Sequence, residues 1–111
     1  MSSSTGTGKI VIIITAPKGE GKRIARALVE SRLAACVNIV QGLTSLYWWQ
    51  GEIQEDQEEL LIVKTRMDAL NKLIDEVKKI HPYSVPEIVA LPILGGNPDY
   101  LKWVDDEVRS S

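Results

Sequence analysis

The fold is decided by residues 35–66, which read ACVNIVQGLTSLYWWQGEIQEDQEELLIVKTR. The first half is rich in Val, Ile, Thr, Tyr and Trp, and the second half ends in the apolar run LLIV at residues 60–63. These residue types favour β-strands, and Gln50-Gly51 followed by acidic residues is typical of a turn. The stretch therefore predicts a long central hairpin of two antiparallel strands.

The segments on either side of the hairpin predict an α+β domain. Residues 9–16 (KIVIIITA) are almost all β-branched and predict a strand that is buried on both faces. The other expected elements are a helix over residues 20–33, a helix from an N-cap at Asp68 to a stop at His81-Pro82, a strand over residues 88–94, and a short helix after Asn97-Pro98. The order β-α-β-β-α-β plus a C-terminal helix predicts a ferredoxin-like split β-α-β antiparallel sheet.

The composition is that of an ordinary globular chain: 44% of the 111 residues are hydrophobic, 25% are charged, and the net charge is −2. We expect a single domain over residues 9–111, preceded by a flexible arm at the Ser/Thr/Gly-rich residues 1–8. The small negative charge argues against a nucleic-acid partner, because phosphate binding needs clustered Lys and Arg. No apolar run is long enough to span a bilayer, so we expect no membrane insertion.

The single cysteine excludes an internal disulfide and fits a reducing compartment. We therefore expect a cytoplasmic location, while a targeting peptide on a longer precursor stays open.

The predicted strands are apolar at both odd and even positions, so both faces of the sheet should be apolar. This holds for residues 10–14, 60–63 and 88–91. Two helices cover only one face of such a sheet, and a bare apolar second face would be larger than soluble monomers usually expose. The sequence therefore predicts a homo-oligomer whose subunits pack through their sheets.

Two stretches have charge patterns that could bind ions. Residues 16–23 (APKGEGKR) lie between a strand and a helix but fail both the Walker A and the dinucleotide-binding patterns, which leaves a turn or a weak anion site at the helix start. The hairpin turn is crowded by Glu52, Glu55, Asp56, Glu58 and Glu59. We expect a solvated tip that discourages edge-to-edge association, or a weak site for hard cations.

Cys36 and His81 each have two possible roles. Cys36 follows small apolar residues and is either a packed residue or a soft ligand for copper or zinc. His81 precedes a proline at a helix end and is either a cap or a metal contact. One Cys and one His do not fill a tetrahedral site, so such a site would need carboxylates, water or a neighbouring subunit.

The aromatic pair and two charged residues suggest an interface or a cleft. Tyr47 and Trp49 should share one face of their strand, with Trp48 on the other, and large aromatics there suit a subunit interface. Lys64 and Glu87 lie beside apolar strands, where they pair with each other or line a cleft. No nucleophile-base constellation is visible, so we expect no enzymatic activity.

Five motifs in this order resemble the CutA family of divalent-cation-tolerance proteins. They are RLAACVN (32–38), SLYWWQG (45–51), ELLIVKT (59–65), HPYSVPEI (81–88) and YLKW (100–103). The resemblance implies a ferredoxin-like fold in a compact homotrimer, in which hairpin edges join sheets between subunits. It also implies a link to the tolerance of copper and other divalent cations.

The resemblance further implies that Cys36 and His81 are the metal ligands. Some family members carry further Cys or His where this chain has Ile14, Glu76 and Ile80, so the binding of copper or another divalent ion should be weak, and no cofactor should be essential. The trimer is similar to that of PII signalling proteins, which place ligands in clefts between subunits. The alternative function is therefore a PII-like sensor of a small molecule, with Tyr47, Trp49, Lys64 and Glu87 as cleft candidates.

Overall fold

The computed structural model describes residues 6–109. In chain order the elements are β1 (Lys9–Pro17), α1 (Gly21–Glu30), β2 (Cys36–Trp49), β3 (Glu52–Arg66), the 3-10 helix η1 (Met67–Ala69), α2 (Leu70–Ile80), β4 (Ile88–Pro92) and α3 (Pro98–Glu107). The strands form one antiparallel sheet in the order β2-β3-β1-β4. This confirms the predicted antiparallel α+β architecture and the hairpin that turns at Gln50-Gly51.

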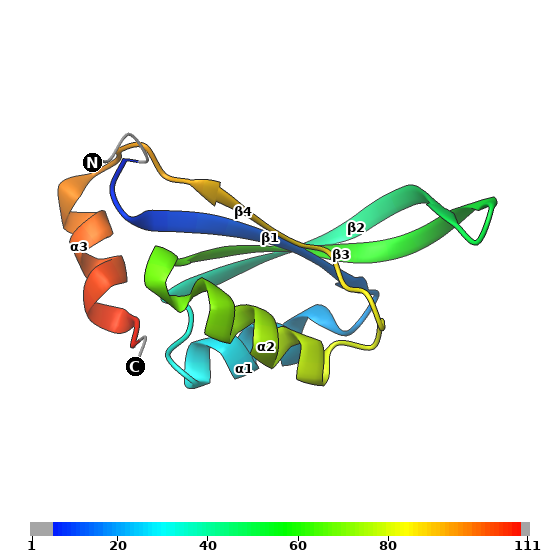
Figure 1. Ribbon diagram of the computed structural model, residues 1–111, viewed down its shortest axis with the longest axis horizontal. Helices are drawn as coiled ribbons and strands as arrows, with labels where there is room; N and C mark the ends of the chain where they lie inside the picture. Colours follow the sequence, from blue (N-terminus) through cyan, green and yellow to red (C-terminus); the bar gives the residue numbers. More distant parts are fainter. Residues whose placement is uncertain (1–5, 110–111) are drawn as a thin grey trace.

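The helices are distributed unevenly around the sheet. Figure 1 shows α1 and α2 side by side on one face, α3 across one end, and the β2–β3 hairpin projecting beyond the helices at the other end. We call the face that α1 and α2 leave uncovered the open face. Among residues 6–109, no helix is long and apolar enough to cross a membrane.

The core lies between the sheet and the two helices. Alternate residues of β1 point into it, and Ile12 and Ile14 have no exposed surface there. They pack in one cluster with residues of α1 and α2, which include Leu28 and Leu73. A two-residue period on the strand and a helical period on the helices therefore meet in one apolar layer.

The open face is apolar as well, as the sequence predicted. Ile13 of β1 pairs with Ile62 of β3 on one side and with Val89 of β4 on the other, so these side chains form a row across the open face. Val89 and Leu91 are about half exposed. Residues 6–109 of a single chain thus leave much of this row in contact with solvent.

Helix α3 is attached to the end of the sheet through charged residues. Asp105 forms an ion pair of 2.8 Å with Lys9. The Arg66 guanidinium donates hydrogen bonds to the carbonyl oxygens of Asp105 and Val108. The helix begins as predicted, with Asn97 Oδ1 accepting from the Asp99 N–H and Pro98 at the first helical position.

Several predicted element ends are wrong. Asp68 is not an N-cap: it lies within η1, where its carboxylate accepts from Arg66, and α2 begins at Leu70 without a side-chain cap. The last strand ends at Pro92 rather than at residue 94, although the Ile93 N–H still donates to the Lys9 carbonyl oxygen at 3.0 Å.

The expected N-terminal arm is described only in part, since residues 1–5 lie outside the described residues. Thr7 Oγ1 donates to the carbonyl oxygen of Ile93 at 2.8 Å, and the Gly8 carbonyl accepts from the Met67 N–H at 2.8 Å. Residues 6–8 are therefore bound to the end of the sheet.

Candidate functional site

A pocket of about 610 Å³ lies where the projecting hairpin meets the loop after α2. Its walls carry hydroxyls (Thr15, Ser45, Ser84), aromatic rings (Tyr47, Trp49, Tyr83), carboxylates (Glu58, Glu87) and aliphatic groups (Leu46, Val85). Except for Leu46, which has the opposite parity on β2, the strand residues among them lie on the open face; Thr15, for example, follows Val11 and Ile13 at the same parity along β1. The pocket therefore opens beside the apolar face that a single chain leaves uncovered.

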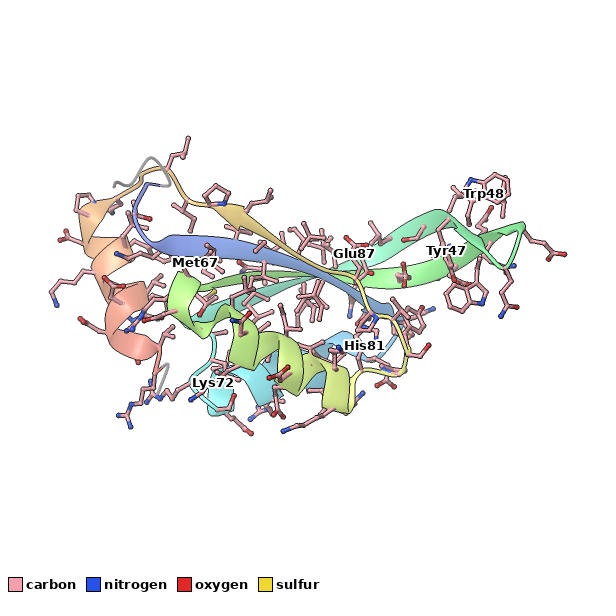
Figure 2. All side chains as sticks on the ribbon, in the orientation of Figure 1. Tyr47, Trp48, Met67, Lys72, His81 and Glu87 are labelled. Atoms are coloured by element: carbon pink, nitrogen blue, oxygen red, sulfur yellow. The ribbon has the colours of Figure 1, made fainter. Side chains whose placement is uncertain are left out.

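An irregularity in β2 shapes the hairpin at this point. The pairing with β3 shifts register between Val40 and Leu43, and Gly42 within the shift has a φ of +81°. Such a bulge bends a strand and increases its twist, and glycine adopts this backbone conformation without strain. Beyond the bulge, Tyr47 and Trp49 line the pocket, while Figure 2 shows Trp48 on the opposite side of the hairpin from Tyr47.

Glu58 is the most deeply placed charged group of the pocket. Its residue is only 5% exposed. Its Oε2 accepts a hydrogen bond of 2.9 Å from the Tyr83 hydroxyl, and no ion pair reaches it from the described residues. Burial, together with this hydrogen bond and the negative charge of Glu58, raises the pKa of Tyr83 well above its usual value. Tyr83 therefore keeps its proton and acts as the donor.

The other carboxylates near the pocket have hydroxyl neighbours. Glu87 Oε1 lies 3.5 Å from Thr15 Oγ1. The Tyr47 hydroxyl donates a hydrogen bond to Asp56, and this bond raises the pKa of Tyr47. Both tyrosine donors of the site are thus committed to carboxylates of the same chain.

His81 lies just beyond the end of α2 (Figure 2) and is almost completely buried. Its Nδ1 accepts from the Tyr83 N–H at 3.0 Å, and its Nε2 lies 2.8 Å from the Thr15 carbonyl oxygen. This pairing fits a neutral ring with its proton on Nε2. The imidazole ties the loop after α2 to β1, and both of its nitrogens are occupied.

Cys36 begins β2 on the open face, at some distance from His81. It pairs with Lys64 of β3, and its Sγ lies 3.9 Å from Asn38 Oδ1. The Lys64 ammonium also donates to Asn38 rather than pairing with Glu87. Desolvation and the neighbouring Cys36 raise the pKa of Tyr100, so the start of α3 lies close to the thiol.

Within one chain, Cys36 and His81 do not share a site. Lys64, the partner of Cys36, pairs with Val11 on β1, whereas His81 contacts Thr15. Four strand residues separate these rows, which is roughly 13 Å at about 3.3 Å per residue. Among residues 6–109, no three His, Cys, Asp or Glu side chains lie close enough together to hold a metal ion.

Three of the four predicted cleft residues lie together in the structure. Tyr47, Trp49 and Glu87 line the same pocket, and Lys64 does not. Sequence reasoning missed Glu58 and Tyr83. Glu58 belongs to an acidic run that we expected to be solvated, and this expectation is wrong for Glu58. The signal that could have identified it is its position along the strand, which places it on the same face as Leu60 and Ile62.

The predicted anion site at the start of α1 is occupied by the chain's own carboxylate. Glu59 is 4% exposed, and its two oxygens accept from the N–H groups of Gly19 (3.1 Å) and Gly21 (2.9 Å). The expectation of a solvated side chain is therefore also wrong for Glu59. A side chain at residue 21 would collide with it, since a Cβ there would lie 2.6 Å from Glu59 Oε1.

Comparisons with known proteins agree over nearly the whole chain. Residues 10–107 match the profile of a family described as CutA1 divalent ion tolerance protein. The chain is 64% identical over 95 residues to the divalent-cation tolerance protein CutA of Thermus thermophilus, which covers 85% of this chain and 92% of that protein.

The same likeness extends to a plant protein and to a solved structure. The chain is 51% identical over 111 residues to "Protein CutA 1, chloroplastic" of Oryza sativa, which covers 99% of this chain but only 63% of that relative's length. The crystal structure of CutA1 from Oryza sativa superposes with a TM-score of 0.91 at 51% identity, covering 97% of this chain and 100% of that one.

Proposed function

Because the chain belongs to the CutA1 divalent ion tolerance family, we propose that it acts as a homotrimer, without catalytic activity, in the tolerance of divalent cations. The observation that carries this proposal is the open face. Its central row, Ile13, Ile62 and Val89, is apolar, and α1 and α2 lie on the other face of the sheet; Val89 is 48% exposed, and Ile13 and Ile62 are partly buried. Burying such a surface against other subunits removes it from water, at about 25 cal/mol for each Å².

The hairpin supports the same assembly. Strand β2 is an outer strand of 14 residues, and its free edge can accept a strand from a neighbour. The projecting part carries the exposed side chains of Leu46, Trp48 and Ile53. A ferredoxin-like trimer whose hairpins join neighbouring sheets would pair this edge and cover these side chains.

Sedimentation equilibrium tests the assembly directly. At micromolar concentration the mass should be three times that of the 12.3 kDa protomer and should not fall on moderate dilution. A protomer mass under these conditions would contradict the proposal, since the open face would then be exposed to water in the working protein.

The metal part of the proposal is weak binding of copper or another divalent cation, with Cys36 and His81 as ligands. Cys36 is partly buried on the open face, and its thiol offers a soft donor. His81 can ligate only by giving up its bond to Tyr83 or to Thr15. The two residues do not fit a shared site within one subunit, so the affinity should be low and any joint site should need a second subunit.

Calorimetric titration of copper and zinc chloride tests these ligands. Relative to wild type, the Cys36→Ala/His81→Ala double variant should bind about tenfold more weakly or worse. Cys36→Ala alone is the control that leaves the hydrogen bonds of His81 intact. Equal affinities in all three proteins would remove both residues from the site.

For the compartment, we propose a cytoplasmic protein, on the basis of its single cysteine. The name of the Oryza sativa relative places that protein in the chloroplast.

A second candidate function, a PII-like regulatory module that senses a small molecule, is favoured by one observation. The 610 Å³ pocket lies beside the open face, so trimer formation would place it next to a subunit interface. Its volume falls in the range of ordinary ligand sites. If calorimetric titration shows no saturable heat with copper or zinc, and titration with a small molecule does show it, this second function replaces the first.

A further inference from the structure

We propose that the pocket between the hairpin and the loop after α2 binds a small organic cation that carries N–H donors, such as a primary ammonium or a guanidinium group. This inference rests on the small-molecule function proposed above and specifies the ligand's chemistry.

The charge of the pocket has one sign. Glu58 and Glu87 are its charged lining residues, and none of the lining residues is Lys, Arg or His. A nucleotide or another anion would therefore meet repulsion without a compensating cation. A cation would meet two carboxylates, one buried at Glu58 and one exposed at Glu87.

Glu58 is the residue that most favours a cationic ligand. Only 5% of the residue is exposed, yet among the described residues it accepts a hydrogen bond only from Tyr83 and forms no ion pair. A buried carboxylate without a cationic partner is costly. The adjacent Glu59 shows the contrast, because each of its oxygens accepts a backbone N–H. Glu59 is thus satisfied internally, whereas Glu58 has one oxygen left for a ligand.

The two tyrosine hydroxyls of the site already donate to carboxylates of the chain. The hydroxyl of Tyr83 donates to Glu58, and that of Tyr47 donates to Asp56. An anionic ligand needs donors, while a ligand with N–H groups needs acceptors. What these pairs leave available is acceptor capacity on the carboxylates, so the pocket matches a donor-bearing cation.

The walls fit an organic ion better than a bare metal ion. The indole of Trp49 and the ring of Tyr47 line the pocket, and aromatic faces attract organic cations. The volume is that of a small molecule rather than of a single ion. The described residues also bring no third acidic, His or Cys ligand to the two carboxylates.

The test is calorimetric titration of the intact, assembled protein at fixed ionic strength with four probes: agmatine, tetramethylammonium, ATP and magnesium chloride. Agmatine, which has an ammonium and a guanidinium group, should bind and should bind more weakly as salt is added. Tetramethylammonium should bind less tightly because it has no N–H donor. ATP and magnesium should give no saturable heat.

Glu58→Gln should lower the affinity for agmatine by about tenfold or more, because it replaces a charged acceptor by a neutral one. Glu55→Gln is the matched control: it removes the same charge from an exposed residue of β3 that does not line the pocket, and it should leave affinity unchanged. Sedimentation and circular dichroism of both variants establish that fold and assembly are kept.

The outcomes separate the two levels of the proposal. Binding of ATP without binding of agmatine overturns the cation inference and leaves the small-molecule function in place. If none of the four probes binds, both the cation inference and the small-molecule function are overturned. If tetramethylammonium binds as tightly as agmatine, the requirement for N–H donors is wrong. If Glu58→Gln weakens the assembly but not agmatine binding, a neighbouring subunit supplies the partner of Glu58, and the inference fails.

Discussion

Replacing Ile13 by aspartate is expected to convert the proposed trimer into monomers at micromolar concentration. Ile13 lies at the centre of the open face, between Ile62 and Val89. In an assembly that buries this face, the new carboxylate would have no partner, which costs about 3–5 kcal/mol per subunit. In a monomer the same side chain faces water, so the fold should persist. Sedimentation equilibrium measures the loss of mass, and circular dichroism checks the fold.

The matched control is Val29→Asp. Val29 lies on α1, on the other side of the sheet, and is 41% exposed, so the same apolar-to-acid change there should leave the assembly intact. Ile13→Asp remaining trimeric would mean that the subunits meet elsewhere. The open face would then need another cover.

Glu59→Ala is expected to lower the free energy of unfolding by about 1–3 kcal/mol. The substitution leaves the buried N–H of Gly21 without its acceptor, whereas the N–H of Gly19, an exposed residue, can bind water instead. The loop between β1 and α1 should lose its geometry at the same time. Urea unfolding should be measured at one protomer concentration, because the stability of an oligomer depends on concentration.

Two further variants separate the causes of this loss. Glu59→Gln keeps one oxygen acceptor and should lose less than Glu59→Ala. Glu55→Gln, on an exposed part of the same strand, should be nearly neutral. If Glu59→Ala were also neutral, the two amides would be satisfied by water, and Glu59 would have no structural role at the start of α1.

The order of the elements could be predicted from local patterns. The β-branched run of β1, the turn at Gln50-Gly51, the stop at His81-Pro82 and the start at Asn97-Pro98 each reflect a local preference of the backbone. The predicted N-cap at Asp68 failed because η1 precedes α2 and Arg66 takes the Asp68 carboxylate. That choice depends on α3, which also bonds to Arg66 and is far away in sequence.

The candidate site could be predicted only in part. Alternation along β2 placed Tyr47 and Trp49 on one face, and both line the pocket. The burial of Glu58 and the two hydrogen bonds of His81 depend on how the loop after α2 packs on β1, and residue types alone do not report such packing. Acidic residues near a hairpin turn are usually solvated, so composition favoured the wrong environment for Glu58.

The place of β1 in the sheet has a consequence for synthesis of the chain. Ile13 is made early, but its two neighbours in the sheet are Ile62 and Val89, which leave the ribosome much later. The hairpin of β2 and β3 can form from neighbouring residues, whereas β1 must wait for both halves of the chain. Until β4 emerges, β1 keeps one unpaired edge and its full set of isoleucines. During translation, this strand is therefore the segment that most needs protection from other nascent chains.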